Sequence, residues 1–285
     1  MYAGGIPLFA EVEDDLTLSP SDLAALLEKD EDVGGVVGTH VYGMPCRVEE
    51  LESLVADYSR RKSRKVFMMY DAAHAFGAKL AGRPVGSFGD AEVFSLSVTK
   101  TLVSVEGGMV ASRDPEVIHR IRRMRNYGIE SNYDAHWPGM NGKMSEFHAI
   151  IGLHNLRRLD QLMGERQSRA RYYFNKIHER TEFETLPWPD GVLHTFKDLT
   201  VLMPEAKTGR RDDVMASLKT QGVETRAYFY PAVHEQQRFR QFADRPLPRT
   251  ESLSRRVITL PFYTTIGEDE MDYVVEALRQ SQEVW

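Results

Sequence analysis

Short apolar runs alternate with amphipathic stretches along the first half of the chain. The runs are bounded by Gly, Pro or charged residues and predict strands at 33–37, 66–70, 91–96 and 109–111. After the first run, Leu51, Leu54 and Val55 recur at helical spacing, which predicts a helix over 48–61. This alternation of strand and helix indicates right-handed parallel crossovers in an α/β sheet that is buried on both faces.

Further elements are signalled at the beginning and in the middle of the chain. The segment GGIPLFAEVEDD, residues 4–15, predicts another strand, and Ser19-Pro20-Ser21 marks the start of a helix. Asp114 is a candidate N-cap for a basic helix over 117–125. We interpret its arginines as a solvated helix face rather than a nucleic-acid-binding surface, because a basic patch that binds nucleic acid needs more than one helix.

The stretch from Ser145 to about Arg180 predicts one long helix. Its leucines and isoleucines form an apolar stripe that indicates a core or a dimer face rather than a cofactor site. His148 and His154 lie on this helix six positions apart, whereas a metal-binding pair on one helix needs positions i and i+4. We therefore expect no metal site from this pair.

The last third of the chain predicts a second, smaller α/β domain. Strands are expected at 200–203, 222–227 and 257–260, and helices at 211–221, 251–257 and 269–280. The expected organisation is a large domain over 1–160, followed by a long linking helix and a small domain over 161–285.

Composition narrows the class of protein without naming a function. The 285 residues are 42% hydrophobic, and 36 basic against 42 acidic residues leave a net charge of −6, which disfavours a general nucleic-acid binder. Cys46 is the single cysteine, so an intrachain disulfide is excluded and a reducing cytoplasm is the simplest compartment. No apolar run approaches the roughly 18 residues that a membrane span requires, so no membrane partner is expected.

The candidate chemistry lies where the central apolar runs end. Asp71 follows one run and Ser95 ends the next, with His74 and Lys100 close behind in the sequence. Such polar residues at strand carboxyl ends lie where open α/β sheets bind ligands. A pyridoxal phosphate (PLP) site needs a lysine amine that condenses with the cofactor aldehyde, and a carboxylate that keeps the ring nitrogen protonated. Each residue alone is unspecific, because a lone Lys is usually a solvated surface residue and an Asp after a strand is usually a cap or turn former.

The combination of motifs is more specific. YDAAHAFG, GRPVGSFGDAEVFSLSVTK and EGGMVAS closely resemble the DegT/DnrJ/EryC1/StrS family of PLP-dependent sugar aminotransferases. The resemblance extends over RIRRMRNYGI, NGKMSEFHAIIGLHNL and the downstream region, and so over nearly all of the chain. It implies PLP fold type I, the aspartate aminotransferase-like fold, with a three-layer large domain and a smaller C-terminal α/β domain.

The resemblance also implies roles for individual residues. Lys100 would bind the cofactor covalently, and Asp71 would pair with its ring nitrogen. His74 stands where the family contacts the ring hydroxyl, and Ser95 stands where it binds the phosphate. Asn141 is expected to reach across a homodimer interface to the partner's cofactor phosphate, so that two chains build each site.

The implied reaction is amino transfer, with L-glutamate as the donor and a nucleotide-linked 4-keto-6-deoxy sugar as the acceptor. The lysine argues for transamination, because the family's dehydratases lack it. Lys143, Arg226 and Tyr228 are candidate substrate-binding residues, although ordinary strand-end packing is an equal alternative for Arg226 and Tyr228. His40 and Tyr42 are expected to line the site. For His40 the alternative is a core histidine whose hydrogen bonds are satisfied within the protein. His234 is a weaker candidate for substrate binding.

Compared with the family pattern, the chain is expected to lack an N-terminal segment that carries an SGTAAL-like motif and part of the phosphate cup. The large domain would then be incomplete at its N-terminus. This raises an alternative from another functional class: a catalytically incomplete member that acts as a non-catalytic partner of a full-length homologue. A nicotinamide-dependent oxidoreductase is disfavoured, because no GxGxxG follows a strand.

Overall fold

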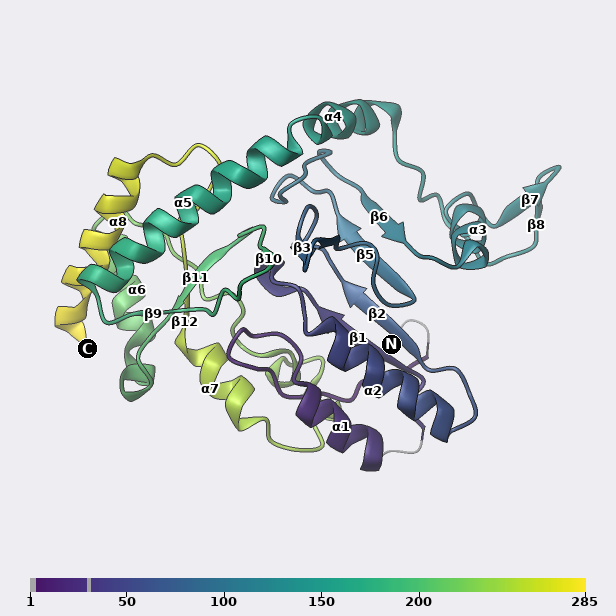
Figure 1. Cartoon of the computed structure of the whole chain (residues 1–285), viewed down its shortest axis with the longest axis horizontal. Coiled ribbons are helices and arrows are strands. Elements are labelled where there is room, and N and C mark those ends of the chain that lie inside the picture. The colour runs from purple at the N-terminus through teal and green to yellow at the C-terminus, as the bar shows by residue number, and fades with distance from the viewer. Residues whose placement is uncertain (1–3, 30–31) are drawn as a thin grey trace. The chain divides into compact units, whose positions relative to one another are not determined.

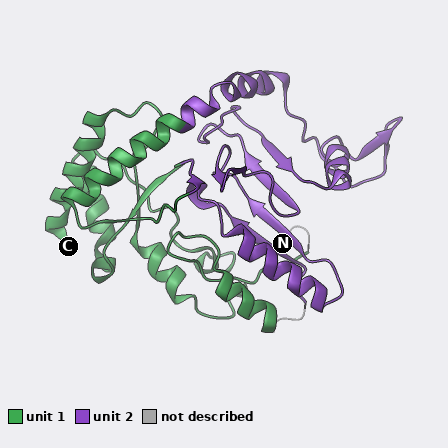
Figure 2. Ribbon diagram, viewed as in Figure 1, with its two compact units in different colours: residues 1–30, 164–190, 196–285 green, residues 31–163, 191–195 purple. Residues whose placement is uncertain are grey.

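The structure is a computed structural model that describes residues 4–29 and 32–285. The chain, drawn in Figure 1, divides into two compact units, which Figure 2 distinguishes by colour. Unit 1 comprises 1–30, 164–190 and 196–285, and unit 2 comprises 31–163 and 191–195. The N-terminal region thus groups with the C-terminal part of the chain. The assignment of 1–160 to a cofactor domain and 161–285 to a small domain stays a prediction.

Unit 2 is built on a four-stranded sheet. Its order is β1 (Gly35–Thr39), β2 (Phe67–Asp71), β5 (Ala91–Ser95) and β6 (Gly108–Ala111). β2 pairs in parallel with β1 and β5, and β6 is antiparallel to β5. The strands predicted from the apolar runs are confirmed to within two residues at each end.

One face of this sheet packs against a helix. α2 (Val48–Arg61) has the predicted bounds, contacts β2, and buries its apolar stripe at Leu51, Val55 and Tyr58. The strands bury alternate residues, as the two-residue repeat of a strand requires, and these include Met68 and Tyr70. Figure 1 shows α2 running alongside this sheet.

The opposite face of the sheet is exposed among the described residues. Val37 is 62% exposed, Phe67 44% and Val93 40%, and all three alternate with buried neighbours on their strands. The prediction of a sheet buried on both faces is therefore wrong for the described chain, because a helix covers only the face that carries Met68 and Tyr70.

The remaining elements of unit 2 are short except for two helices. They are β3 (Lys79–Leu80), β4 (Arg83–Pro84), β7 (Ile129–Ser131), β8 (Asp134–Ala135), β10 (Val192–Leu193), the 3-10 turn η1 (Val41–Gly43), α3 (Pro115–Met124) and α4 (Glu146–Leu156). Asp114 caps α3 as predicted, since its carboxylate accepts the N–H of Glu116 at 2.9 Å.

The single helix predicted from Ser145 to about Arg180 is broken. It forms α4 and α5 (Leu159–Arg180), and Ser145 is the N-cap of α4, since its side chain accepts the N–H of His148. Near the break the Asn155 side chain donates to the carbonyl of Val103 at 2.8 Å, which ties the end of α4 to a distant loop. A tertiary contact of this kind overrides the helical periodicity of the sequence.

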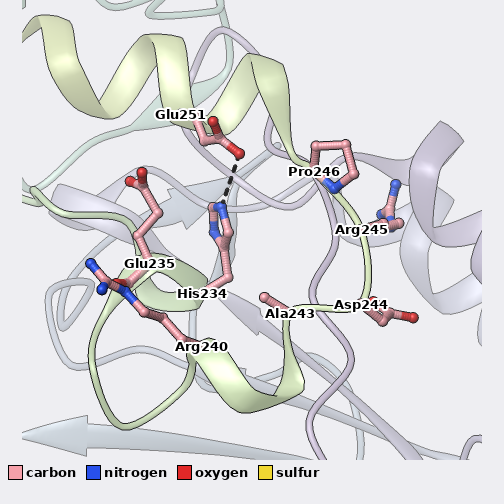
Figure 3. Close-up of a pocket in the computed structure, with 8 residues that line it drawn as sticks. All are labelled: His234, Glu235, Arg240, Ala243, Asp244, Arg245, Pro246 and Glu251. Carbon is pink, nitrogen blue, oxygen red and sulfur yellow. Dashed lines mark hydrogen bonds and ion pairs between the residues drawn. The ribbon is translucent and has the colours of Figure 1, made fainter.

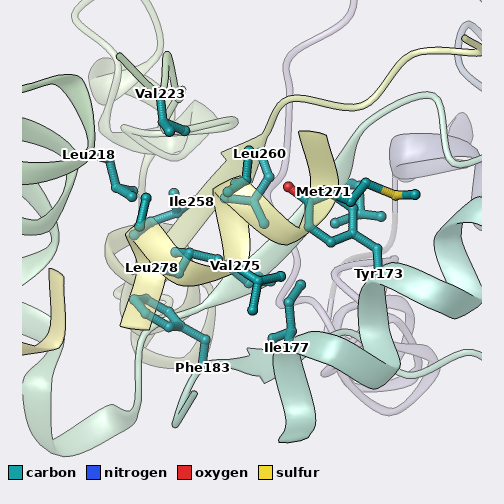
Figure 4. Packing of buried hydrophobic residues seen from close by; sticks show 14 of the residues in the cluster. Tyr173, Ile177, Phe183, Leu218, Val223, Ile258, Leu260, Met271, Val275 and Leu278 are labelled. Carbon is teal, nitrogen blue, oxygen red and sulfur yellow. The ribbon is translucent and has the colours of Figure 1, made fainter. Parts of the chain in front are cut away.

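Unit 1 has a three-stranded antiparallel sheet in the order β12-β11-β9. Its strands and helices are β9 (Glu184–Thr185), β11 (Leu199–Leu202), β12 (Val257–Leu260), α1 (Pro20–Lys29), α6 (Arg211–Thr220), α7 (Pro248–Arg256) and α8 (Glu268–Ser281), with 3-10 turns η2 (Glu205–Arg210), η3 (Val233–Glu235), η4 (Arg240–Phe242) and η5 (Gln282–Val284). Figure 4 shows Tyr173 and Ile177 of α5, Ile258 of β12 and Val275 of α8 in one buried cluster.

Two strand predictions in unit 1 are wrong. Described residues 4–15 form only an isolated bridge from Val12 to Leu18, because side chains satisfy the backbone: Asp22 accepts the N–H of Glu11, and Thr250 that of Val12. Residues 222–227 likewise form only the Arg226–Thr259 bridge. Within the two described ranges, no helix is long and apolar enough to cross a membrane.

Candidate active site

Three polar residues end neighbouring strands of the unit 2 sheet on its exposed face. The parallel register places Thr39 opposite Asp71, and Asp71 opposite Val93 of β5. Ser95 lies two residues beyond Val93, and since side chains two apart share a face, it follows Val93 on the same side. The sheet thus brings Asp71 and Ser95 to the carboxyl edge where α/β sheets hold ligands.

Asp71 is fixed at the end of β2 by both its backbone and its side chain. Its carbonyl accepts the N–H of His40 at 2.9 Å, which continues the pairing with β1. Its carboxylate oxygen Oδ1 accepts the N–H of Ala73 at 2.9 Å and closes a turn. The carboxylate is therefore ordered on the exposed face rather than folded into the core.

His74 lies half-buried after this turn. Its Nδ1 accepts the backbone N–H of Tyr42 at 3.2 Å, and its carbonyl accepts the hydroxyl of Thr195 at 2.7 Å. Ring and backbone are held by two different segments, which are 32 and 121 positions away in the sequence. Two distant segments therefore hold His74, which follows Asp71 by three positions in the sequence.

His40 lies beneath the site in the core. Its Nδ1 accepts the N–H of Cys46 at 2.9 Å, its Nε2 lies 3.3 Å from Glu92, and its ring stacks on Tyr70 at 4.7 Å. Both His40 and Glu92 are fully buried. The core-histidine alternative is therefore correct, and His40 is not part of the site wall; Tyr42 is also buried.

Glu92 is a structural residue that the sequence reasoning overlooked. Its Oε2 accepts the N–H of Phe88 at 2.8 Å and also that of Gly86, so one buried carboxylate holds a loop to the sheet. The signal was a charged residue inside the apolar run 91–96. Buried charge of this kind needs partners, and here they are His40 and the loop amides.

Ser95 and Lys100 belong to the same stretch of unit 2. The half-buried Ser95 hydroxyl lies 3.5 Å from the backbone nitrogen of Ser97. Lys100 is half-buried in the turn that follows, where its backbone N–H donates to the Ser97 carbonyl at 3.0 Å. The turn places a lysine shortly after the strand end that carries Ser95.

Asn141 and Lys143 lie in an exposed segment of unit 2. Asn141 forms a bridge with Asn126, and the N–H of Gly142 donates to the carbonyl of Arg125 at 2.8 Å. The Lys143 ammonium lies 4.1 Å from the centre of the Tyr127 ring, a cation–π distance. The segment is therefore attached to the end of α3 while both candidate side chains remain at the surface.

Arg226 and Tyr228 lie in unit 1. The Arg226 guanidinium donates to the Tyr228 hydroxyl at 2.8 Å, and this hydrogen bond raises the pKa of Arg226 above its ordinary value. The pair holds a permanent positive charge at the surface next to an aromatic ring. Because they belong to a different unit from Asp71, their part in the same site stays a prediction.

A cavity of about 560 Å³ lies in unit 1 beside His234, and its lining includes none of the predicted cofactor residues (Figure 3). His234 points toward Glu251, with Nε2 3.4 Å from the carboxylate. Arg245 on its wall pairs with Asp22. Two charged groups of the lining thus have ion-pair or hydrogen-bond partners, and a role of His234 in substrate binding stays a prediction.

Comparison with known proteins settles the family. A family model described as the DegT/DnrJ/EryC1/StrS aminotransferase family matches residues 1–279. The chain belongs to this family. The resemblance inferred from the motifs is confirmed.

Individual family members show how far the similarity extends. A dTDP-3-amino-3,4,6-trideoxy-alpha-D-glucose transaminase of Micromonospora megalomicea subsp. nigra is 32% identical, over 97% of this chain and 73% of its own length. GDP-perosamine synthase of Vibrio cholerae is 28% identical, over 98% of this chain and 74% of its own length. The chain thus spans about three quarters of the length of these relatives.

Solved structures confirm the predicted fold class, PLP fold type I. DesI, crystallised in the presence of its TDP-sugar product, is 35% identical with a TM-score of 0.87, covering 98% of this chain and 70% of DesI. PseC of Helicobacter pylori, at 22% identity, has a TM-score of 0.92 over all of this chain and 76% of PseC, and shows the fold alone.

The polar residues at the ends of β2 and β5 and in the turns that follow them suit the cofactor of this fold type. Asp71 offers a carboxylate, Ser95 a hydroxyl, His74 an imidazole and Lys100 an amine, all within unit 2. These are the functional groups that a pyridinium nitrogen, a phosphate, a ring hydroxyl and an aldehyde respectively bind. The residues present therefore fit pyridoxal phosphate.

Proposed function

We propose that the protein is a PLP-dependent aminotransferase that transfers an amino group from L-glutamate to a nucleotide-linked 4-keto-6-deoxy sugar. The observation that carries this proposal is the common edge and face of Asp71 and Ser95 in a chain that retains Lys100. The names of the relatives, which are transaminases and synthases of nucleotide-linked amino sugars, support the substrate class.

Each residue of the strand edge has a distinct task in the proposed reaction. PLP, when bound, supplies an aldehyde carbon that takes up the amino group and a ring that disperses the electron pair left by proton removal. The Asp71 carboxylate holds a proton on the ring nitrogen, and Ser95 hydrogen-bonds the phosphate. The Nζ of Lys100 acts first as a general base, which removes a proton from the carbon that bears the amino group. It then acts as a general acid, which returns the proton to the carbon that takes up the amino group in exchange.

The proposed substrate contacts come from charge and hydrogen-bonding capacity. Lys143 and Arg226 are exposed cations suited to phosphate or carboxylate groups, and the ring of Tyr228 suits the face of a sugar. The Arg226–Tyr228 hydrogen bond orients that guanidinium before any substrate arrives. Either cation could meet the diphosphate of the nucleotide or the carboxylates of glutamate.

We further propose that the active form is a homodimer in which Asn141 contributes to the partner's cofactor phosphate site. Support comes from α4. All residues of this helix are described, most of them are apolar, and none of them is buried. Phe147 is 81% exposed, Ile150 63% and Leu153 61%. A helix this apolar needs a partner surface.

The test begins with cofactor binding by the purified chain. Wild type mixed with PLP should show the visible absorbance of a lysine-bound cofactor, and borohydride should attach the cofactor irreversibly to the peptide that contains Lys100. The Lys100→Ala variant should show neither signal while it retains its circular dichroism spectrum. Labelling of another lysine would contradict the assignment of Lys100 as the lysine that binds the cofactor covalently.

The role of Asp71 is tested separately. Asp71→Asn should still bind PLP but lose at least about a thousandfold in amino transfer, because an amide cannot keep the ring nitrogen protonated. An unchanged turnover rate would exclude that role. A wild type that binds no PLP but restores activity to a full-length homologue would favour the alternative function. The protein would then be a non-catalytic partner of that homologue and not an enzyme itself.

A further inference from the structure

One nitrogen of the His74 ring, Nδ1, is hydrogen-bonded by a backbone amide. The N–H of Tyr42 donates to His74 Nδ1 at 3.2 Å. A ring nitrogen that accepts a hydrogen bond does so through its lone pair, so in the neutral ring the proton resides on the other nitrogen. We infer that the Tyr42 amide and Thr195 are positioning groups that fix His74 as the Nε2–H tautomer, a hydrogen-bond donor toward the cofactor.

The Tyr42 amide reaches His74 because the chain turns unusually sharply at η1. Tyr42 has φ 54° and ψ 0°, a left-handed conformation that non-glycine residues rarely adopt, and its side chain is buried. Backbone strain of this kind persists only where the surroundings impose it, and it concentrates at functional sites.

The next residue shows how closely this turn approaches His74. Gly43 has φ 99°, and a Cβ added there would lie 1.7 Å from Thr195 Oγ1 and 2.8 Å from the His74 carbonyl oxygen. Only glycine fits at this position. The turn, Thr195 and the backbone of His74 are therefore in direct contact.

Thr195 fixes the backbone of the same histidine. Its hydroxyl, on a fully buried side chain, donates to the His74 carbonyl at 2.7 Å and lies 3.4 Å from the Tyr42 carbonyl. It therefore links the two segments that must stay in register for the Tyr42 amide to face Nδ1. Removal of the hydroxyl would leave the His74 carbonyl without this donor and the ring free to shift.

The consequence for the cofactor rests on the proposed function. A ring that donates from Nε2 attracts an oxygen that carries negative charge, such as the deprotonated ring hydroxyl of PLP, and a lone pair at that position would repel it. Glutamine shares this ability, since its amide nitrogen reaches as far as Nε2. Asparagine can replace Nδ1 but is too short to replace Nε2.

The tautomer itself can be measured without cofactor. Long-range ¹H–¹⁵N spectra of the histidine-labelled, cofactor-free protein should show His74 with its proton on Nε2, with assignment by loss of that signal in His74→Gln. Thr195→Ser should keep the single tautomer, and Thr195→Val should give mixed or shifted signals. A proton on Nδ1, or an unchanged His74 spectrum in Thr195→Val, would overturn the inference.

The effect of the His74 hydrogen bond on the cofactor is measured as the affinity for PLP rather than as the turnover rate. His74→Gln should bind PLP within about threefold of wild type, and His74→Asn about tenfold more weakly, the effect of one lost hydrogen bond. Equal affinities of the two variants would contradict the donor role. A wild type that binds no PLP would contradict the proposed function, while the spectra would still decide the tautomer.

Discussion

Glu251, at the start of α7, shows how a single carboxylate can connect several parts of unit 1. Its Oε1 accepts the N–H of Leu247 at 3.1 Å and lies 3.4 Å from His234 Nε2. The Leu247 hydrogen bond, and to a lesser degree the interaction with His234, holds the pKa of Glu251 below its ordinary value. A carboxyl whose pKa is lowered by folding adds stability above its unfolded pKa, and this stability is lost as pH falls through the folded pKa.

We therefore expect Glu251→Gln to lower the free energy of unfolding by about 0.5–1.5 kcal/mol at pH 7. The difference from wild type should shrink as pH falls below about 4.5, where the carboxyl becomes protonated in the unfolded state and then in the folded state. Urea unfolding at several pH values measures it, and Glu50→Gln, at an exposed position of α2, serves as the control. A difference that does not change with pH would show that charge has no part in it.

Sequence reasoning identifies residues that carry chemistry more readily than residues that position them. Asp71 and Ser95 stand out because they lie where apolar runs end, and Lys100 stands out because it follows shortly after the second run. Their roles stay predictions. The contacts of His74 with Tyr42 and Thr195 join segments 32 and 121 positions apart. No local pattern encodes such contacts, since they depend on how distant segments pack.

At the scale of elements, periodicity succeeds where one face of an element is buried and the other exposed. The bounds of α2 match the prediction because its apolar stripe packs in the core and its charges face solvent. The prediction fails at residues 4–15, where side chains of Asp22 and Thr250 replace a neighbouring strand as hydrogen-bond partners. It also fails after Leu156, where α4 ends although helix-forming residues continue.

The core of unit 1 should depend on β12 and the helices packed on it. Ile258 is fully buried on β12 and belongs to the cluster that includes Val275 and Leu278 of α8. Ile258→Ala removes buried methyl groups and leaves a cavity, so we expect a loss of about 2–5 kcal/mol in the free energy of unfolding.

The matched control for this variant is Ile6→Ala. Ile6 is 78% exposed, so the same change in chemistry should alter stability by no more than about 0.5 kcal/mol. Denaturant unfolding followed by circular dichroism compares the two variants. Equal effects would mean that the cluster in Figure 4 does not stabilise unit 1.

At the scale of the whole molecule, the distribution of exposed apolar side chains is uneven. In unit 2, α4 exposes Phe147, Ile150 and Leu153, and the open face of the sheet exposes Val37 and Phe67. Scattered apolar residues are normal on a protein surface, but contiguous groups mark interaction surfaces. On α4 these three residues follow one another at intervals of three positions, so that each is a neighbour of the next on the helix surface, which suits a helix–helix contact.

Charge placed on α4 should therefore separate the proposed dimer. Phe147→Glu and Ile150→Glu each put a carboxylate into an apolar contact, and the cost of burying it should weaken dimerisation at least about a hundredfold. Sedimentation velocity should then report a monomer with an unchanged circular dichroism spectrum. The control Ile6→Glu, which changes an exposed isoleucine of unit 1, should leave the dimer intact.

The same variants distinguish an incidental contact from a functional one. If Asn141 completes the cofactor site of a second copy, the monomeric variants should bind PLP more weakly although every candidate cofactor residue of their own chain is unchanged. Raising the protein concentration until the variants dimerise should restore the affinity, because only the assembly has been weakened. Monomers that bind PLP as tightly as the wild-type dimer would place the whole cofactor site within one chain and exclude the role proposed for Asn141.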